Sequence, residues 1–214
     1  MRIKQCNVRS PARQLSYTVT DTTLARLSVN RKSTMANDYL ISKWRNWFGF
    51  FDHNKDGKVC YADMETARSK FTSLHHLEGE QKQKSNDAFT KWWVEYVMWG
   101  KKEITVDEFL EKQNAAFKAN KEAFVARMHK CEEIICHFVG VSGDGNISEE
   151  DILIILKAGG HGDEEQDKKF FHEFNKKGNT FPVKKMVELW THHLTSEDSS
   201  LPDPCQKAMG DINQ

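Results

Sequence analysis

Residues 52–63 carry oxygen-bearing side chains at alternate positions, a pattern suited to holding a metal ion. Asp52, Asn54 and Asp56 stand at the first, third and fifth positions of this stretch, and Gly57 follows at the sixth. A hard divalent cation needs several oxygen ligands at short range, and alternate residues of one tight turn supply them. The glycine permits the sharp turn. The stretch is therefore a candidate metal-binding loop.

The same stretch matches the EF-hand calcium loop, which assigns roles to its remaining positions. Lys58, at the seventh position, offers its backbone carbonyl while its charge points away. Val59 stands where a short β-bridge to a partner loop is expected. The twelfth position is Asp63, although the motif has Glu there. Asp is one methylene shorter and more often reaches an ion with one oxygen, so we expect weakened Ca²⁺ affinity or a mixed Ca²⁺/Mg²⁺ site.

A second loop is expected at residues 97–108, with Ile104 in the β-bridge position. Only Glu108, at the twelfth position, remains of the acidic ligands. Val97 and Lys101 replace the side chains of the first and fifth positions. Because carboxylates are lost and positive charge is added, this loop is expected to repel cations and to be structural.

A third loop is expected at residues 140–151, with Ile147 in the bridge position. Gly140 stands at the first position, where it supplies neither a ligand nor a negative charge. The candidate ligands are Ser142, Asp144, Asn146 and Asp151. Charge count tunes affinity over decades, so this loop is interpreted as either a weak site or a vestigial one.

The fourth loop lies around Gly178, and its register is ambiguous. Any register places Val183, Lys184 or Lys185 at the twelfth position. No pair of carboxylates survives in this loop, and we expect it to bind no cation.

Apolar residues at spacings of three and four predict a helix before and after each loop. These helices are expected over residues 38–51, 63–74, 88–99, 107–117, 123–139, 149–156, 163–174 and 183–194. The predicted fold is all-α, with four EF-hand helix-loop-helix units in two pairs packed as one compact unit. Residues 35–119 form the N-terminal pair, and residues 120–214 form the C-terminal pair with a C-terminal tail.

The charge balance hides a division of the chain. The sequence has 31 basic and 31 acidic residues, but residues 1–34 have a net charge of +6 and the other 180 residues have −6. This balance argues against a nucleic-acid-binding protein. The basic leader, residues 1–34, is predicted to be disordered; its Arg- and Ser-rich composition also fits a mitochondrial transit peptide. The longest apolar run, Ile152–Leu156, is too short to span a membrane.

Other reactive side chains show no catalytic constellation, so no enzymatic activity is predicted. The five cysteines lack a CxxC pair and are interpreted as reduced thiols, which fits an intracellular protein. The six tryptophans are predicted to be core residues, with a ligand-lining role as the alternative. They are Trp44, Trp47, Trp92, Trp93, Trp99 and Trp190.

One intact loop, a lysine-bearing second, a partial third and a degenerate fourth resemble the invertebrate sarcoplasmic calcium-binding proteins. The resemblance extends over roughly residues 36–210 and is carried by Asn46–Asp56, by Val141–Gly145 and by Met186–Ser196. It implies a compact pair of EF-hand pairs, calcium ions as the partner and a cytoplasmic Ca²⁺/Mg²⁺ buffer. It names no protein partner.

Two alternatives stay open at this point. The neighbouring photoproteins and luciferin-binding proteins share this architecture, so the chain is alternatively a calcium-responsive binder of a hydrophobic small molecule. The other alternative is an EF-hand scaffold that is largely independent of calcium.

Overall fold

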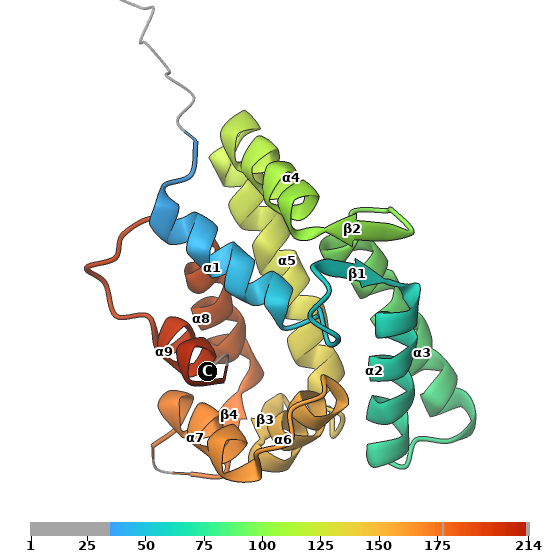
Figure 1. Ribbon diagram of the computed structural model, residues 1–214. Helices are drawn as coiled ribbons and strands as arrows, with labels where there is room; N and C mark the ends of the chain where they lie inside the picture. The colour runs from blue at the N-terminus through green and yellow to red at the C-terminus, as the bar shows by residue number, and fades with distance from the viewer. Residues whose placement is uncertain (1–34, 177, 213–214) are drawn as a thin grey trace, which may run out of the picture. The chain divides into compact units, whose positions relative to one another are not determined.

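The computed structural model describes residues 35–176 and 178–212, and over these residues the chain forms nine α-helices, one π-helical segment and four short strands (Figure 1). The α-helices are α1 (Asp38–Gly49), α2 (Tyr61–Leu74), α3 (Gly79–Trp92), α4 (Val106–Ala119), α5 (Lys121–Val139), α6 (Glu149–Ala158), α7 (Glu164–Phe174), α8 (Val183–Thr195) and α9 (Pro204–Ile212). The π-helical segment is η1 (Trp93–Val97), and the strands are β1 (Lys58–Cys60), β2 (Glu103–Thr105), β3 (Asn146–Ser148) and β4 (Thr180–Pro182). The disordered leader or transit peptide predicted for residues 1–34 lies outside the described residues.

Helix α1 shows how the sequence pattern produces an element. The side chain of Asn37 accepts a hydrogen bond from the backbone N–H of Leu40 at 2.9 Å, which caps the first turn. Leu40, Trp44 and Phe48 follow at intervals of four and are all buried. The predicted helix is confirmed, and it ends two residues earlier than expected, at Gly49.

The strands join the four loops in two antiparallel pairs. Val59 of β1 lies opposite Ile104 of β2, as the bridge positions predicted. Ile147 of β3 lies opposite Phe181 of β4. The second pairing resolves the register of the fourth loop, because it places Lys185 at the twelfth position.

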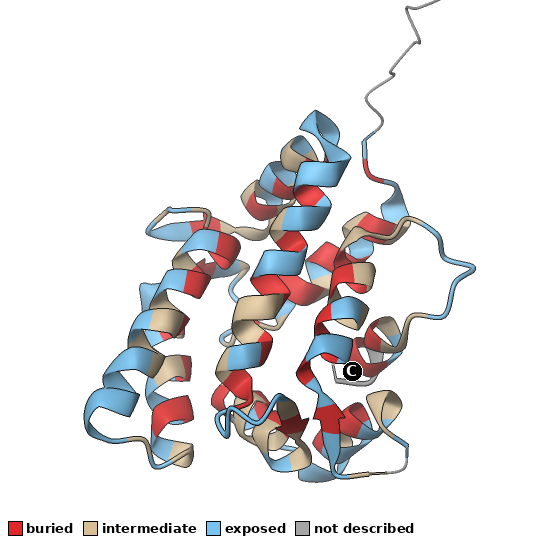
Figure 2. Cartoon of the chain, turned by 180° about the vertical axis from the view of Figure 1, so that it is seen from behind, coloured by how far each residue is buried: buried red, intermediate tan, exposed pale blue. Residues whose placement is uncertain are grey.

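Helix α5 connects the two loop pairs. It packs against α3 and α4 on one side of the fold and against α6 and α8 on the other (Figure 1). Each of these helices carries both buried and exposed residues along its length, coloured red and pale blue in Figure 2. Phe138 and Trp190 pack against both of the buried apolar clusters, so the cores of the two pairs are continuous.

Two parts of the fold depart from the predicted helices. Helix α3 begins at Gly79, nine residues before its predicted start, because Glu, Gln and Lys favour helix without an apolar face. Helix α9 was not predicted. It starts with Pro204 at a position that tolerates proline, and it buries Cys205, Ala208 and Met209.

The aromatic and thiol side chains mostly occupy the core. Trp44, Trp47, Trp92 and Trp93 are at most 4% exposed, so the core prediction is confirmed for these four. The cysteines that the structure describes are free thiols, and three of them are buried. Within the described residues, no helix combines the length and the apolar character needed to cross a membrane.

Candidate metal centre

The first loop has the backbone turn that its sequence predicted. It follows α1 and leads through β1 into α2. Lys55 and Gly57 have φ angles of 56° and 80°, in the left-handed region. Glycine adopts this conformation without strain, so Gly57 allows the chain to reverse direction here.

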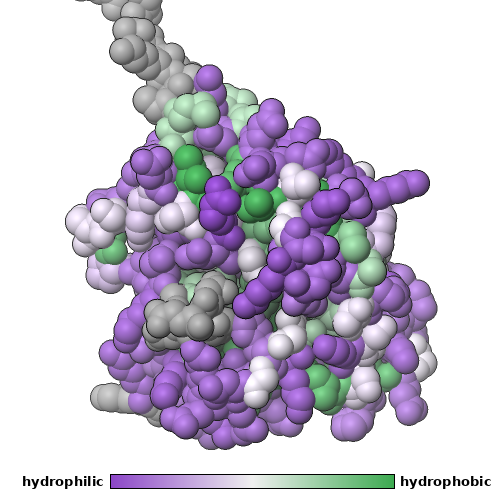
Figure 3. Space-filling view, in the orientation of Figure 1, coloured by the Kyte–Doolittle hydropathy of each residue, from purple (hydrophilic) through white to green (hydrophobic). Residues whose placement is uncertain are grey.

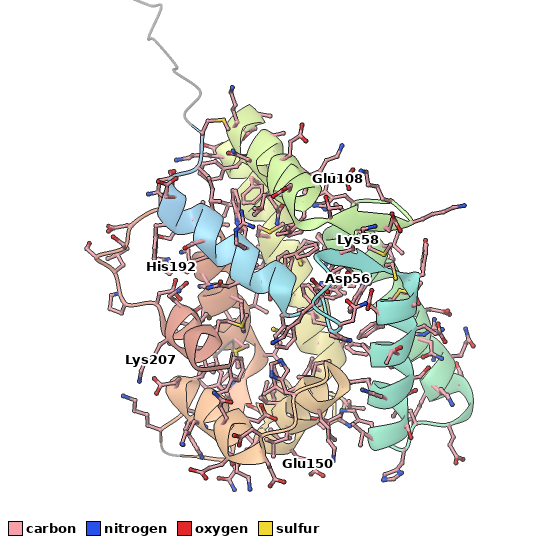
Figure 4. The ribbon with its side chains drawn as sticks, viewed as in Figure 1. Asp56, Lys58, Glu108, Glu150, His192 and Lys207 are labelled. Carbon is pink, nitrogen blue, oxygen red and sulfur yellow. The ribbon has the colours of Figure 1, made fainter. Side chains whose placement is uncertain are left out.

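Hydrogen bonds fix the acidic side chains around this turn. Oδ2 of Asp52 accepts a hydrogen bond from the N–H of Gly57 at 2.8 Å, and Asp52 is only 7% exposed. Oδ1 of Asn54 accepts from the N–H of Asp56 at 3.1 Å. Oδ1 of Asp56 accepts from the N–H of Lys58 at 2.9 Å. The three side chains are thus ordered along one turn. Figure 4 shows Asp56 in this turn and Lys58 just after it, at the start of β1.

Asp63 has a different local role at the start of α2. Its Oδ2 accepts a hydrogen bond from the N–H of Cys60 at 2.9 Å, which caps the helix. Among the described residues, no three His, Cys, Asp or Glu side chains meet at metal-binding distances. Asp52, Asp56 and Asp63 therefore lie in one loop, but the structure does not bring their carboxylates together. The donor set of three carboxylates, an amide and a carbonyl nevertheless matches the oxygen preference of Ca²⁺ and Mg²⁺.

The second loop holds an ammonium group against its one remaining acidic ligand position. Nζ of Lys101 donates to Oε1 of Glu108 at 2.6 Å, while Oε2 accepts from the N–H of Thr105 at 3.1 Å. The hydrogen bond from Lys101 lowers the pKa of Glu108. Figure 4 shows Glu108 at the start of α4, close to the two-stranded ribbon that joins this loop to the first. The positive charge at Glu108 is therefore the ammonium group of Lys101.

The third loop keeps the turn geometry of the first. Gly143 and Gly145 have φ angles of 70° and 84°. Oδ1 of Asp144 accepts from the N–H of Asn146 at 2.8 Å, and this bond lowers the pKa of Asp144. Oδ2 of Asp151 accepts from the N–H of Ser148 at 2.8 Å, as Asp63 does with Cys60. Local hydrogen bonds thus involve all four candidate ligands of this loop, which are Ser142, Asp144, Asn146 and Asp151.

The first position of this third loop has no room for a side chain. Gly140 is buried, and a Cβ built on it would lie 2.8 Å from the carbonyl oxygen of Asn146. Real Cβ atoms do not approach backbone oxygens so closely. The missing acid at Gly140 is thus accompanied by a close approach between the first and seventh positions of the loop.

The fourth loop is closed by an amide side chain. With Phe181 at the bridge position, Phe174 stands first and Lys185 twelfth. Nδ2 of Asn175 donates to the carbonyl oxygens of Gly178 and Thr180 at 2.8 and 2.7 Å. No carboxylate occupies a ligand position, in agreement with the sequence.

Four helix-loop-helix units joined in two pairs by antiparallel bridges define a four-EF-hand protein. The chain is 32% identical over 173 residues to the sarcoplasmic calcium-binding protein of Mizuhopecten yessoensis, covering 80% of this chain and 98% of the relative. The chain belongs to the sarcoplasmic calcium-binding protein family, a family of calcium-binding proteins. The resemblance that the loops indicated is therefore confirmed.

Solved structures support the same fold. The coelenterazine-binding protein of Renilla muelleri, in its calcium-loaded apo form, matches with a TM-score of 0.64 and 16% identity, over 79% of this chain and 93% of that chain. The complex of apoaequorin with (S)-HM-daCTZ matches with a TM-score of 0.60 and 18% identity, over 85% and 96%. At these identities the likeness concerns the fold alone. No family model matches the chain.

Proposed function

We propose that the protein is a cytoplasmic Ca²⁺/Mg²⁺ buffer that takes up its ion mainly in the first loop. The carboxylates of Asp52, Asp56 and Asp63 would hold the ion, together with the amide oxygen of Asn54 and the carbonyl of Lys58. The ion would neutralise three carboxylates and tie α1 to α2 across the loop. The supporting observation is the pairing of this acidic loop with one whose remaining acid, Glu108, is already paired with the ammonium group of Lys101.

The C-terminal segment favours a buffer over a sensor that opens to bind a target helix. Sensors of this fold lay an amphipathic helix of their target into an apolar groove. Here α9 packs against α7 and α8 of its own chain, and Ala208 and Met209 lie in the apolar cluster of the C-terminal pair. The face seen in Figure 3 is mostly hydrophilic, with small separate apolar patches. Helix α9 of the same chain thus covers apolar residues of the C-terminal pair.

The Asp at position twelve gives the proposed site its ion preference. Mg²⁺ accepts fewer ligands at shorter distances than Ca²⁺ does, and a carboxylate that reaches with one oxygen suits it comparatively well. We therefore propose that millimolar Mg²⁺ competes with Ca²⁺ for the first loop. The third loop, with Asp144 and Asp151 but no acid at its first position, is proposed as a weaker site.

Calorimetric titration of Ca²⁺ into the chelator-treated full chain, with and without millimolar Mg²⁺, tests this proposal. We expect one dominant site whose apparent Ca²⁺ affinity falls when Mg²⁺ is present. Asp52→Ala should abolish this site, whereas Asp144→Ala should leave it intact and remove only weaker binding. Unchanged Ca²⁺ affinity in Asp52→Ala would overturn the assignment. An absence of saturable heat in a folded wild-type chain would instead favour the calcium-independent scaffold.

A further inference from the structure

A cavity of about 110 Å³ lies between the two EF-hand pairs. It is lined from both sides, by residues of α1, α2, α3 and η1 and by residues of α5, α6, α7 and α8. Four of the six tryptophans take part in this lining: Trp47, Trp92, Trp93 and Trp190. The tryptophans therefore serve the core and also form the wall of an internal space.

The lining contains a buried carboxyl group with an unused oxygen. Glu132 of α5 lines the cavity and is 3% exposed, and its Oε1 is buried without a hydrogen-bond partner. Nε1 of Trp93, another lining residue, is also buried without a partner. An unpaired buried polar atom costs about 1–3 kcal/mol, so such atoms favour a ligand that pairs with them. The other ionisable side chains of the lining are His53 and the thiol of Cys136.

The state of Glu132 sets the charge of a suitable ligand. Burial raises the pKa of Glu132 to about 8, against a weaker opposite effect of its hydrogen bond with Cys131. The carboxyl group is then uncharged at neutral pH and can donate or accept a hydrogen bond. A charged ligand would have to leave water for an aromatic cavity without a fixed counter-charge, at large cost. A neutral ligand with one hydrogen-bonding group fits better.

The volume of the cavity limits the size of the ligand. A dry apolar cavity of about 150 Å³ binds benzene in other proteins, so the space here corresponds to one small ring. A multi-ring compound of the luciferin type exceeds it. We propose that this cavity binds a neutral single-ring aromatic molecule with one hydroxyl group, which pairs with Oε1 of Glu132 while its ring packs among the tryptophans.

Phenol and toluene are matched probes, because they differ chiefly in a hydroxyl against a methyl group. Each is titrated into the full chain, followed by calorimetry and by tryptophan fluorescence. We expect saturable binding of both, with phenol bound more tightly. In Glu132→Met we expect at least a tenfold loss of phenol affinity, with toluene affinity retained or increased. Glu133→Met, the same change on the neighbouring residue outside the lining, should change neither affinity.

A second variant keeps the test decisive if Glu132→Met does not fold. Ala67 of α2 is buried and lines the cavity, so Ala67→Leu should fill part of it and weaken both probes at least tenfold. Absence of saturable binding of either probe to wild type would overturn the proposal. So would an unchanged phenol affinity in Ala67→Leu, or an equal effect of Glu132→Met on phenol and toluene.

Discussion

Nζ of Lys43 lies 3.3 Å from Oδ2 of Asp203, and both side chains are buried although the residues are 160 positions apart. Lys43 also donates to the carbonyl of Ser196 at 2.8 Å, and Asp203 contacts Nδ1 of His193 at 3.0 Å. These contacts attach the segment before α9 to α1. Helix α9 packs on the apolar cluster of the C-terminal pair, and α1 of the N-terminal pair thus helps to hold it in place.

Removing the positive partner of this pair should destabilise the fold. Lys43→Met leaves Asp203 in a buried position without its ammonium group, and breaking a buried pair typically costs about 3–5 kcal/mol. His193 remains beside Asp203, so we expect a loss near the lower end, roughly 3 kcal/mol in the free energy of unfolding measured in urea. Lys84→Met, which breaks an exposed pair with Glu80, should cost less than about 0.5 kcal/mol. Equal losses in the two variants would contradict a special role for the buried pair.

Acid should weaken the same attachment. Burial alone would raise the pKa of Asp203, but its hydrogen bond with His193 and the nearby charges lower it well below the usual range. A carboxyl group with a lowered folded-state pKa stabilises the fold above its unfolded pKa near 4, and this stability is lost as pH falls further. Asp203→Asn should therefore show a flatter fall in unfolding free energy below pH of about 4 than wild type. If the unfolding free energies of the two proteins fell with the same slope below pH of about 4, this expectation would be contradicted.

Glu132 should make the protein less stable as the pH rises. Its pKa is raised from 4.5 to about 8 by burial, and the thiols of Cys131, Cys136 and Cys205 face it without adding positive charge. A raised carboxyl pKa stabilises the fold in full below the unfolded value, and this contribution is lost as pH rises through about 8. Glu132→Gln should raise the unfolding free energy at pH 7 by roughly 3 kcal/mol and flatten its pH dependence between about pH 5 and 8.

Urea unfolding at a series of pH values measures this slope. Glu133→Gln is the matched control, since Glu133 directly follows Glu132 in α5 but pairs with Lys130 at 2.6 Å near the surface. The control should follow the wild-type curve. A wild-type curve without a decline above pH of about 5, relative to Glu132→Gln, would show that Glu132 is already ionised in the folded protein.

Lengthening Asp63 should strengthen calcium binding in the first loop. The second loop shows how Glu acts at this position: Oε2 of Glu108 caps the helix while Oε1 contacts the ammonium group of Lys101. Asp63→Glu should likewise keep the cap and extend an oxygen toward the ion. We expect about a tenfold higher Ca²⁺ affinity and weaker competition by Mg²⁺, measured by calorimetry. An unchanged ratio of Ca²⁺ to Mg²⁺ affinity would show that position twelve does not set the preference.

Any side chain at Gly140 should strain the third loop. Because a Cβ there would lie 2.8 Å from the carbonyl oxygen of Asn146, Gly140→Ala and Gly140→Asp should each lower the unfolding free energy in chelator by about 1–2 kcal/mol. Gly49→Ala is a control, since nothing lies within 4 Å of the Cβ position at Gly49. If Gly140→Ala were as stable as the control, the close approach would not constrain this position.

The sequence predicted local features well and distant ones poorly. The bridge positions Val59 and Ile104 followed from a short motif, because an EF-hand loop fixes its own register. The fourth register stayed open, since no ligand residue marked it, and only the pairing of Phe181 with Ile147 resolved it. Polar helix formers hid the start of α3, where no apolar stripe marks the helix.

Long-range contacts explain the remaining differences. The spacing of Ala208 and Met209 is too short a signal to predict α9, whose stability comes from packing against α7 and α8. Nothing in the sequence around Lys43 or Glu132 distinguishes them from the many exposed lysines and glutamates of the chain. Their burial depends on which helices meet, and that is a property of the assembled fold. The unpaired oxygen of Glu132 could therefore be found only in the structure.

Each two-stranded ribbon joins a loop that keeps at least two acidic ligand positions to a loop that has lost most or all of them and carries lysines. With the proposed sites, two ions would not lie side by side within a pair, and ion binding in one loop would not be helped by a second ion across the ribbon. A single independent site goes from one-tenth to nine-tenths occupied over about an 80-fold range of free ion, whereas cooperative sites fill over a narrower range. Uptake would then be gradual, and the protein would damp both small and large changes in ion concentration instead of marking one threshold.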